Sequence, residues 1–188
     1  MMVEFWAYGV LAAVLIAASV TDVRRGRIPN ALTYSAMAAG FIGHALLGGL
    51  YGGPHRMGAM DALAGFAAGF LPMLAAWLAG GVGGGDAKLM GAVGALTGWK
   101  FALAALFYGL VFAAIMAVII MIRRRIVLQT LGRLWRFVVL AFSGVRPPDP
   151  TTSQSPRVPL GLAMAMGAAA VFIEWTWFHS MGFSILGF

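Results

Sequence analysis

The sequence predicts an all-α integral membrane protein with six transmembrane helices and one amphipathic helix on the cytoplasmic membrane surface. Of its 188 residues, 61% are hydrophobic and 10% are charged, whereas soluble domains carry about 25% charged residues. Apolar segments that approach the length of a bilayer crossing recur along the chain. Because the basic residues lie between these segments and not along one exposed face, the net charge of +7 indicates membrane topology and not nucleic-acid binding.

The first apolar segment is expected to remain on the protein as a span. Met1 to Glu4 offers no positive charge, and the basic cluster Arg24, Arg25 and Arg27 follows the apolar run. A cleaved signal peptide has the opposite order, with its positive region first.

Six segments are expected to cross the membrane: Phe5 to Thr21, Asn30 to Leu50, Ala59 to Ala79, Asp86 to Thr97, Phe101 to Ile122 and Val158 to Phe178. The fourth is the shortest, since a helix over that range rises only about 18 Å at about 1.5 Å per residue. We therefore expect either a thinned bilayer around this helix or a water-filled cavity at one of its ends.

The distribution of basic residues predicts the orientation. Of the 13 Lys and Arg residues, all except Arg56 and Lys100 lie in or beside the first, third and fifth connections. The positive-inside rule places these connections in the cytoplasm and both termini outside. Asp22 and Asp86 are then both expected at the cytoplasmic boundary.

Residues 126–143 are predicted to form an amphipathic helix on the inner leaflet. Gln129, Arg133 and Arg136 share one helical face, and large apolar side chains cover much of the remainder. The proline-rich stretch from Arg146 to Pro159 is typical of a flexible link. No domain boundary is required, so residues 1–188 are expected to form a single membrane-embedded domain.

Glycines at helical spacing predict close packing of the third and fourth spans. Gly65 and Gly69 lie in the third span, and Gly91, Gly94 and Gly98 in or just after the fourth. Residues this small let helix backbones approach closely in a membrane.

Asp22 is the first candidate for chemistry, because acidic groups this close to hydrocarbon are costly and are often functional. It precedes a loop that contains Ile28, Pro29 and Asn30. Pro29 disfavours helix at Ile28, and Asn30 can cap the second span, so the loop is expected to be a sharp return with Asp22 at its entrance. Considered alone, an acid at this position is more often an interfacial partner of Arg24 or Arg25 than a catalytic residue.

Asp86 is the second candidate, directly after Gly83, Gly84 and Gly85. An acidic residue at this position is also an ordinary helix-capping signal. However, glycines without side chains would let an extended substrate backbone reach the carboxylate. Lys88 could hold substrate or tune Asp86, or could serve only as an interfacial positive charge.

Taken together, these motifs resemble those of the prepilin peptidases. Gly83 to Asp86 resembles the GxGD signature of membrane aspartyl proteases, and Lys88 extends it as in prepilin peptidases. Asp22 with the downstream Ile-Pro-Asn is similar to the family's other hallmark, and Pro159-Leu160-Gly161 to a weaker third element. The chain resembles the short, Flp-type (tight-adherence pilus) branch, because it has no Cys and so lacks the four-Cys metal site of the methyltransferase region in larger relatives.

The resemblance implies a catalytic pair, Asp22 and Asp86, that uses water and needs no metal or other cofactor. It also implies a set of residues that shape the site or bind substrate: Gly83, Gly85, Lys88, Pro29 and Asn30. The expected substrates are prepilins or pseudopilins with a short basic leader, cleaved at the cytoplasmic face of a bacterial inner membrane. The lipid bilayer is the other expected partner, and the oligomeric state, a homo-oligomer included, is left open.

Two other functions remain open at this stage. A presenilin-like or signal-peptide-peptidase-like protease shares GxGD but cuts within a transmembrane helix. A non-enzymatic transporter or pilus-assembly scaffold could use the same carboxylates to bind a proton or a cation.

Overall fold

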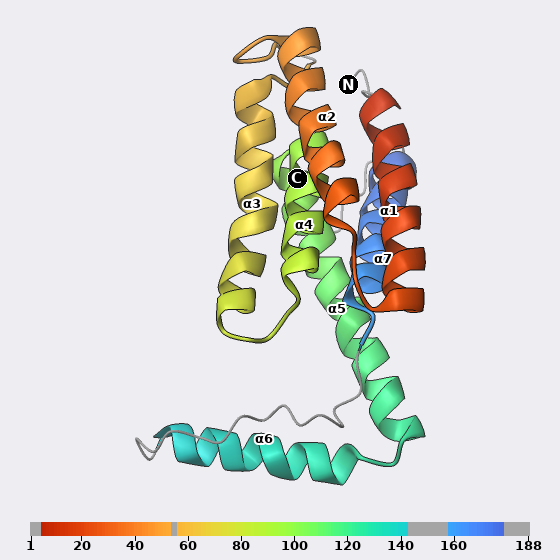
Figure 1. Cartoon of the computed structure of the whole chain (residues 1–188), viewed down its shortest axis with the longest axis vertical. Helices are drawn as coiled ribbons and strands as arrows, with labels where there is room; N and C mark the ends of the chain where they lie inside the picture. Colours follow the sequence, from red (N-terminus) through yellow and green to blue (C-terminus); the bar gives the residue numbers. More distant parts are fainter. Residues whose placement is uncertain (1–4, 54–55, 143–157, 179–188) are drawn as a thin grey trace. The chain divides into compact units, whose positions relative to one another are not determined.

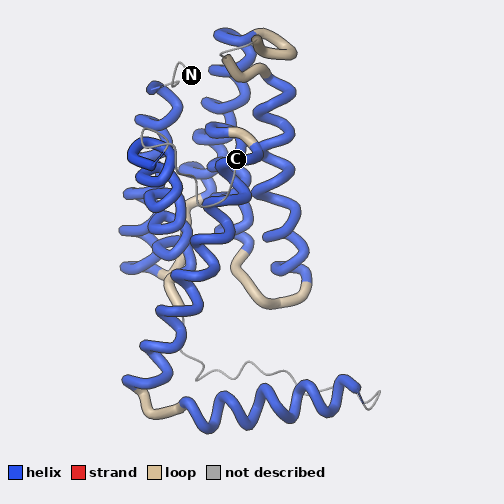
Figure 2. Tube along the Cα trace, turned by 180° about the vertical axis from the view of Figure 1, so that it is seen from behind, coloured by secondary structure: helices blue, strands red, loops and turns tan. Residues whose placement is uncertain are grey.

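The computed structural model describes residues 5–53, 56–142 and 158–178, and within them every regular element is helical (Figure 2). The chain divides into two compact units. One comprises residues 1–112 together with 159–188, and the other comprises residues 113–158.

The first unit is a helical bundle with α4 at its centre (Figure 1). Its elements are α1 (Phe5–Arg25), α2 (Asn30–Gly48), α3 (Ala59–Leu78), α4 (Gly84–Thr97), the first part of α5 (Trp99–Arg123), α7 (Leu160–Ile173) and a π-helical turn (Glu174–Phe178). Helix α4 contacts α1, α2, α3 and α7, and its residues from Leu89 to Thr97 are all buried. This short helix is therefore surrounded by other helices of the unit.

Each of the six apolar segments predicted from the sequence contains a helix, but the first helix is longer than expected. Helix α1 runs past Thr21 to Arg25, and the return begins at Gly26, whose φ of 60° suits glycine. Asp22 therefore lies in the last turn of the helix and not at the entrance to a loop. The reason is that Arg24 and Arg25 are good helix formers whose positive charge is favoured at a helix C-terminus.

Four helices are long and apolar enough to cross a membrane: α1, α2, α3 and α5. Helix α4 has 14 residues and is too short for this group, and the apolar helix over Leu160–Thr176 is also shorter. These helices indicate an integral membrane protein, while the count of six spans stays a prediction.

The close packing of α3 against α4 is confirmed. A Cβ atom added to Gly94 would overlap the carbonyl oxygen of Gly65, and one added to Gly69 would overlap the carbonyl oxygen of Met90. Because backbone atoms cannot rotate away as side chains do, these positions fix the distance between the two helices. In this way α4 is held against the long helix α3.

The second unit contains the remainder of α5, a tight turn and α6 (Val127–Phe142). Arg125 occupies the turn with a φ of 57°. Helix α6 exposes large apolar side chains at helical spacing: Leu128, Leu131, Trp135 and Val139. The helix is present at the predicted residues, its position on a membrane surface stays a prediction, and most of the predicted link to α7 falls outside the described residues.

We predict that Gly94→Ala separates α3 from α4 and destabilises the protein by about 1–3 kcal/mol, as overpacking does in a close-packed interior. Thermal unfolding of the purified protein in detergent measures this change. Gly9→Ala is the matched control, since nothing lies within 4 Å of a Cβ at Gly9. Equal unfolding midpoints for the two variants would contradict the packing argument.

Candidate active site

Several helix ends meet at one end of the first unit. Helix α1 ends there, and α2, α4 and α7 begin there, as the lower part of Figure 1 shows. Both predicted acids lie at these ends, Asp22 in the last turn of α1 and Asp86 in the first turn of α4. The fold thus brings the two sequence motifs to the same end of one bundle.

Asp22 is partly buried and is fixed by a contact with α7. Its Oδ2 accepts a hydrogen bond of 2.8 Å from the backbone N–H of Gly161, which is 139 residues away in sequence. The first N–H groups of a helix have no acceptor within the helix, so a carboxylate is a suitable partner for one of them. In the described part of the chain, no ion pair joins Asp22 to the arginines that follow it. The Asp22 side chain is therefore directed to the start of α7.

Ile28 fills the space between the two motifs. Its side chain is buried, and a Cβ atom added to Gly161 would lie 3.0 Å from Ile28 Cδ1. A Cβ atom added to Gly85, the residue before Asp86, would lie 3.4 Å from Ile28 Cβ. Ile28 thus packs beside Gly161, which contacts Asp22, and beside Gly85, which precedes Asp86. Pro29 follows it in an extended conformation and is the N-cap of α2.

Asp86 lies outside the four candidate membrane spans and is electrostatically coupled to Asp22. Burial and, to a smaller extent, the Asp22 carboxylate raise the pKa of Asp86 to about 6, while a hydrogen bond from the Gly83 backbone acts in the opposite direction. A Cβ atom on Gly83 would lie 2.9 Å from Asp86 Oδ2, so glycine at this position leaves room for the carboxylate. Two carboxylates that interact in a partly buried site resist double ionisation.

Lys88 joins the start of α4 to the start of α2. Its Nζ donates a hydrogen bond of 2.9 Å to Asn30 Oδ1 and lies 5.1 Å from the centre of the Tyr34 ring, within the range of a cation–π interaction. The prediction that Asn30 caps α2 is wrong, because Pro29 is the N-cap and no side-chain capping bond forms. Asn30 is instead the first residue of the helix, and its side chain contacts α4.

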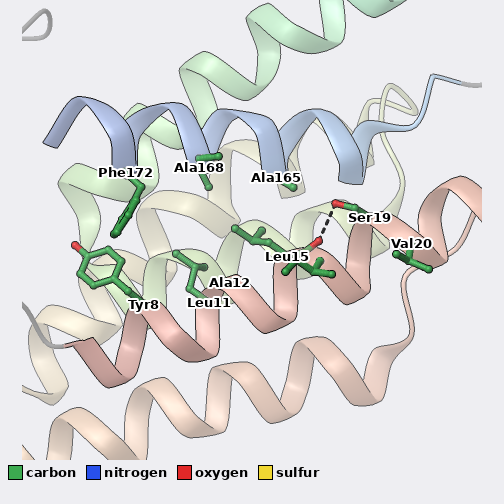
Figure 3. Close-up of a pocket in the computed structure, with 11 residues that line it drawn as sticks. Tyr8, Leu11, Ala12, Leu15, Ser19, Val20, Ala165, Ala168 and Phe172 are labelled. Carbon is green, nitrogen blue, oxygen red and sulfur yellow. Dashed lines mark hydrogen bonds between the residues drawn. The ribbon is translucent and has the colours of Figure 1, made fainter. Parts of the chain in front are cut away.

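An apolar pocket of about 410 Å³ lies between α1 and α7 (Figure 3). Its lining includes Tyr8, Leu11 and Leu15 of α1 and Ala168 and Phe172 of α7. The hydroxyl of Ser19, another lining residue, donates to the carbonyl of Leu15, so its polar group is satisfied within α1. The pocket extends along α1 as far as Val20, two residues before Asp22.

The other acidic and histidine side chains that the structure describes have partners elsewhere in the fold. His44 is buried and bonds a backbone carbonyl of α4, Asp61 accepts from the backbone at the start of α3, and Glu174 accepts from Tyr108. Glu4, His55 and His179 lie outside the described residues. Among the residues that are described, no group of three or more His, Cys, Asp or Glu side chains is arranged to hold a metal ion.

Two contributors to the site received no role from the sequence. Ile28 appeared only as a neighbour of Pro29, and Gly161 only as part of the weak Pro-Leu-Gly element. A signal existed in both cases, because each residue belongs to a motif that carries the resemblance. The contact each residue makes could not be read from its local pattern.

Comparison with known proteins identifies the family. A model described as the type IV leader peptidase family matches residues 9–118, a range that contains Asp22, Ile28 and Asp86. Searches of curated proteins and of solved structures gave no significant match. Because the family model covers well over half of the chain, the chain belongs to the type IV leader peptidase family and is a peptidase of the prepilin leader type.

Proposed function

We propose that this protein is a membrane aspartyl endopeptidase of the short, Flp-type branch, with Asp22 and Asp86 as its catalytic pair. The observation that carries the proposal is geometric: two partly buried acids from distant parts of the chain lie at the same end of one helical bundle, where the Asp22 carboxylate contributes to raising the pKa of Asp86. Structural acids of this kind are commonly paired with basic groups. Here the hydrogen-bond partner of Asp22 is the backbone amide of Gly161. The Asp22 carboxylate helps to raise the pKa of a second acid, Asp86.

The mechanism follows from a pair that shares one proton. The ionised carboxylate removes a proton from a water molecule as the water oxygen attacks the scissile carbonyl carbon. The protonated carboxyl group donates its proton to the developing oxyanion. The C–N bond then breaks when the amine takes up a proton from the pair, and the products are a carboxylate on the leader and a free amine on the mature protein. Because the two carboxyl groups interact, their proton gains and losses are properties of the pair and not of one aspartate.

The proposed substrate is a prepilin or pseudopilin with a short basic leader followed by a hydrophobic helix. Two features of the first unit support this choice. Gly83 and Gly85 place no side chains before Asp86, and Gly83 is exposed, so an extended peptide can approach the backbone there. The apolar pocket beside α1 extends to within two residues of Asp22. Cleavage is proposed at the cytoplasmic edge of a bacterial inner membrane, with both chain termini on the opposite side.

We predict that Asp22→Asn and Asp86→Asn each lower the cleavage rate by at least about 10³-fold, because either change removes the proton transfer that the pair supplies. Purified protein in detergent is mixed with a Flp-type prepilin, and loss of the leader is followed as a mobility shift. Asp61→Asn is the matched control: this acid caps α3, and the amide oxygen of Asn can accept the same bond.

Three other outcomes of this experiment would contradict the proposal. Retained cleavage in one Asp variant removes that residue from the mechanism. A product cut within the hydrophobic helix favours a presenilin-like protease. No cleavage by the wild-type protein favours a transporter or scaffold.

We predict that kcat/KM falls as the pH rises above about 6. Asp86 has a raised pKa of about 6, so it keeps its proton below that pH and loses it above. The pair requires one proton, and the rate should therefore decrease toward tenfold per pH unit on the alkaline side. Prepilin cleavage measured between about pH 5 and 9 tests this, and a rate that increases from pH 6 to 9 would contradict it.

We predict that Lys88→Met lowers cleavage by less than about tenfold, corresponding to about 1.4 kcal/mol of barrier. Lys88 bonds Asn30 and contacts Tyr34, so it positions α2 relative to α4 and transfers no proton in the proposed mechanism. Asn30→Ala should have a similar effect, since it removes the other half of the same hydrogen bond. A Lys88→Met variant as inactive as Asp86→Asn would assign Lys88 a direct part in the chemistry.

A further inference from the structure

We propose that Gly161 is a positioning residue of the peptidase reaction, which holds the Asp22 carboxylate in its working orientation through its backbone N–H and its lack of a side chain. The inference rests on the proposed function and adds α7 to the site. Gly161 lies beyond residues 9–118, the range that the family model matches. It therefore brings a third segment of the chain to the two acids.

The hydrogen bond defines what Gly161 does. Gly161 is the second residue of α7, in the turn whose N–H groups have no acceptor within the helix. Its N–H donates to Oδ2 of Asp22 over 2.8 Å. A carboxylate has two oxygens, and engagement of Oδ2 leaves Oδ1 free to exchange a proton during the reaction. The hydrogen bond thus fixes the rotation of the Asp22 carboxylate about the Cβ–Cγ bond.

The absence of a side chain at Gly161 is equally necessary. A Cβ atom there would lie 2.9 Å from Asp22 Oδ2, 3.2 Å from Asp22 Cβ and 3.0 Å from Ile28 Cδ1. Real Cβ atoms essentially never approach another heavy atom as closely as the first of these distances. Any larger residue must therefore displace Asp22, and Ile28, which also packs against Gly85, would transmit the displacement toward Asp86.

The competing explanation is that Asp22 only caps α7. A cap stabilises a helix, and its loss lowers stability without a specific effect on turnover. A positioning role instead predicts a loss in kcat at nearly constant KM, since the proton transfer is misaligned while the substrate still binds. The two roles are therefore separable by measurement.

The first experiment detects the contact without any activity. The full-length chain is labelled with ¹⁵N-glycine in detergent, and the Gly161 amide resonance is identified by its loss in Gly161→Ala. Asp22→Asn should shift this resonance upfield, because a charged acceptor becomes a neutral one. The Gly9 amide lies in the first half of α1, far from Asp22 at the end of the same helix, and should not move. An unchanged Gly161 resonance in Asp22→Asn would overturn the proposal.

The second experiment tests positioning. Gly161→Ala should lower kcat for prepilin cleavage by at least about tenfold with KM within about twofold, since small misplacements of a reacting group can cost about 10²-fold. Gly9→Ala is the matched control and should leave both constants unchanged. Unchanged kcat in Gly161→Ala, or a loss confined to thermal stability, would overturn the proposal.

A rescue variant keeps the test valid if Gly161→Ala folds poorly. Ile28→Val removes Cδ1, one of the atoms that the new Cβ would approach most closely. The double variant Gly161→Ala with Ile28→Val should therefore recover part of the lost kcat, and a double variant no better than Gly161→Ala contradicts the steric argument. If the wild-type protein cleaves no prepilin, the proposed function fails, whereas the Gly161 resonance still decides whether the contact exists.

Discussion

The whole site depends on the cost of keeping two carboxylates together in a partly buried place. A buried charge needs hydrogen bonds or an opposite charge, and two like charges also repel. The fold meets this requirement with helix starts. Asp22 accepts from the first turn of α7, and Asp86 lies in the first turn of α4 with a bond from the Gly83 backbone. In the proposed mechanism a shared proton relieves the remaining repulsion, and acid–base hydrolysis uses that proton.

The position of Asp86 depends in turn on the packing of α4. A helix of 14 residues at the centre of the bundle is held in place by the helices packed around it. Gly65 and Gly94 bring the backbones of α3 and α4 into contact, and Lys88 joins the start of α4 to the start of α2. Gly65 and Gly94 lie far from the acids, but they fix the position of α4 against α3 and therefore the position of Asp86 at the start of α4.

Features of the fold and the site that depend on local sequence pattern could be predicted. Apolar runs predicted the helices, glycine spacing predicted the contact of α3 with α4, and the two motifs predicted which acids to compare. Contacts between distant segments could not be predicted, because nothing in the residues around Gly161 indicates that its N–H meets Asp22. The failed cap at Asn30 has a similar cause. A local rule favoured the capping role, but a lysine from another helix offered the side chain a different partner.

Helix α7 connects the chemistry to the proposed substrate. Gly161 in its first turn binds the Asp22 carboxylate, and Ala165, Ala168 and Phe172 further along the same helix line the apolar pocket against α1. The carboxylate therefore lies at one end of a surface that is suited to an apolar segment and unsuited to a charged one. A leader peptidase must act where a hydrophobic helix meets a polar leader. A carboxylate at the end of an apolar surface satisfies that geometric requirement, and a carboxylate in the middle of such a surface would not.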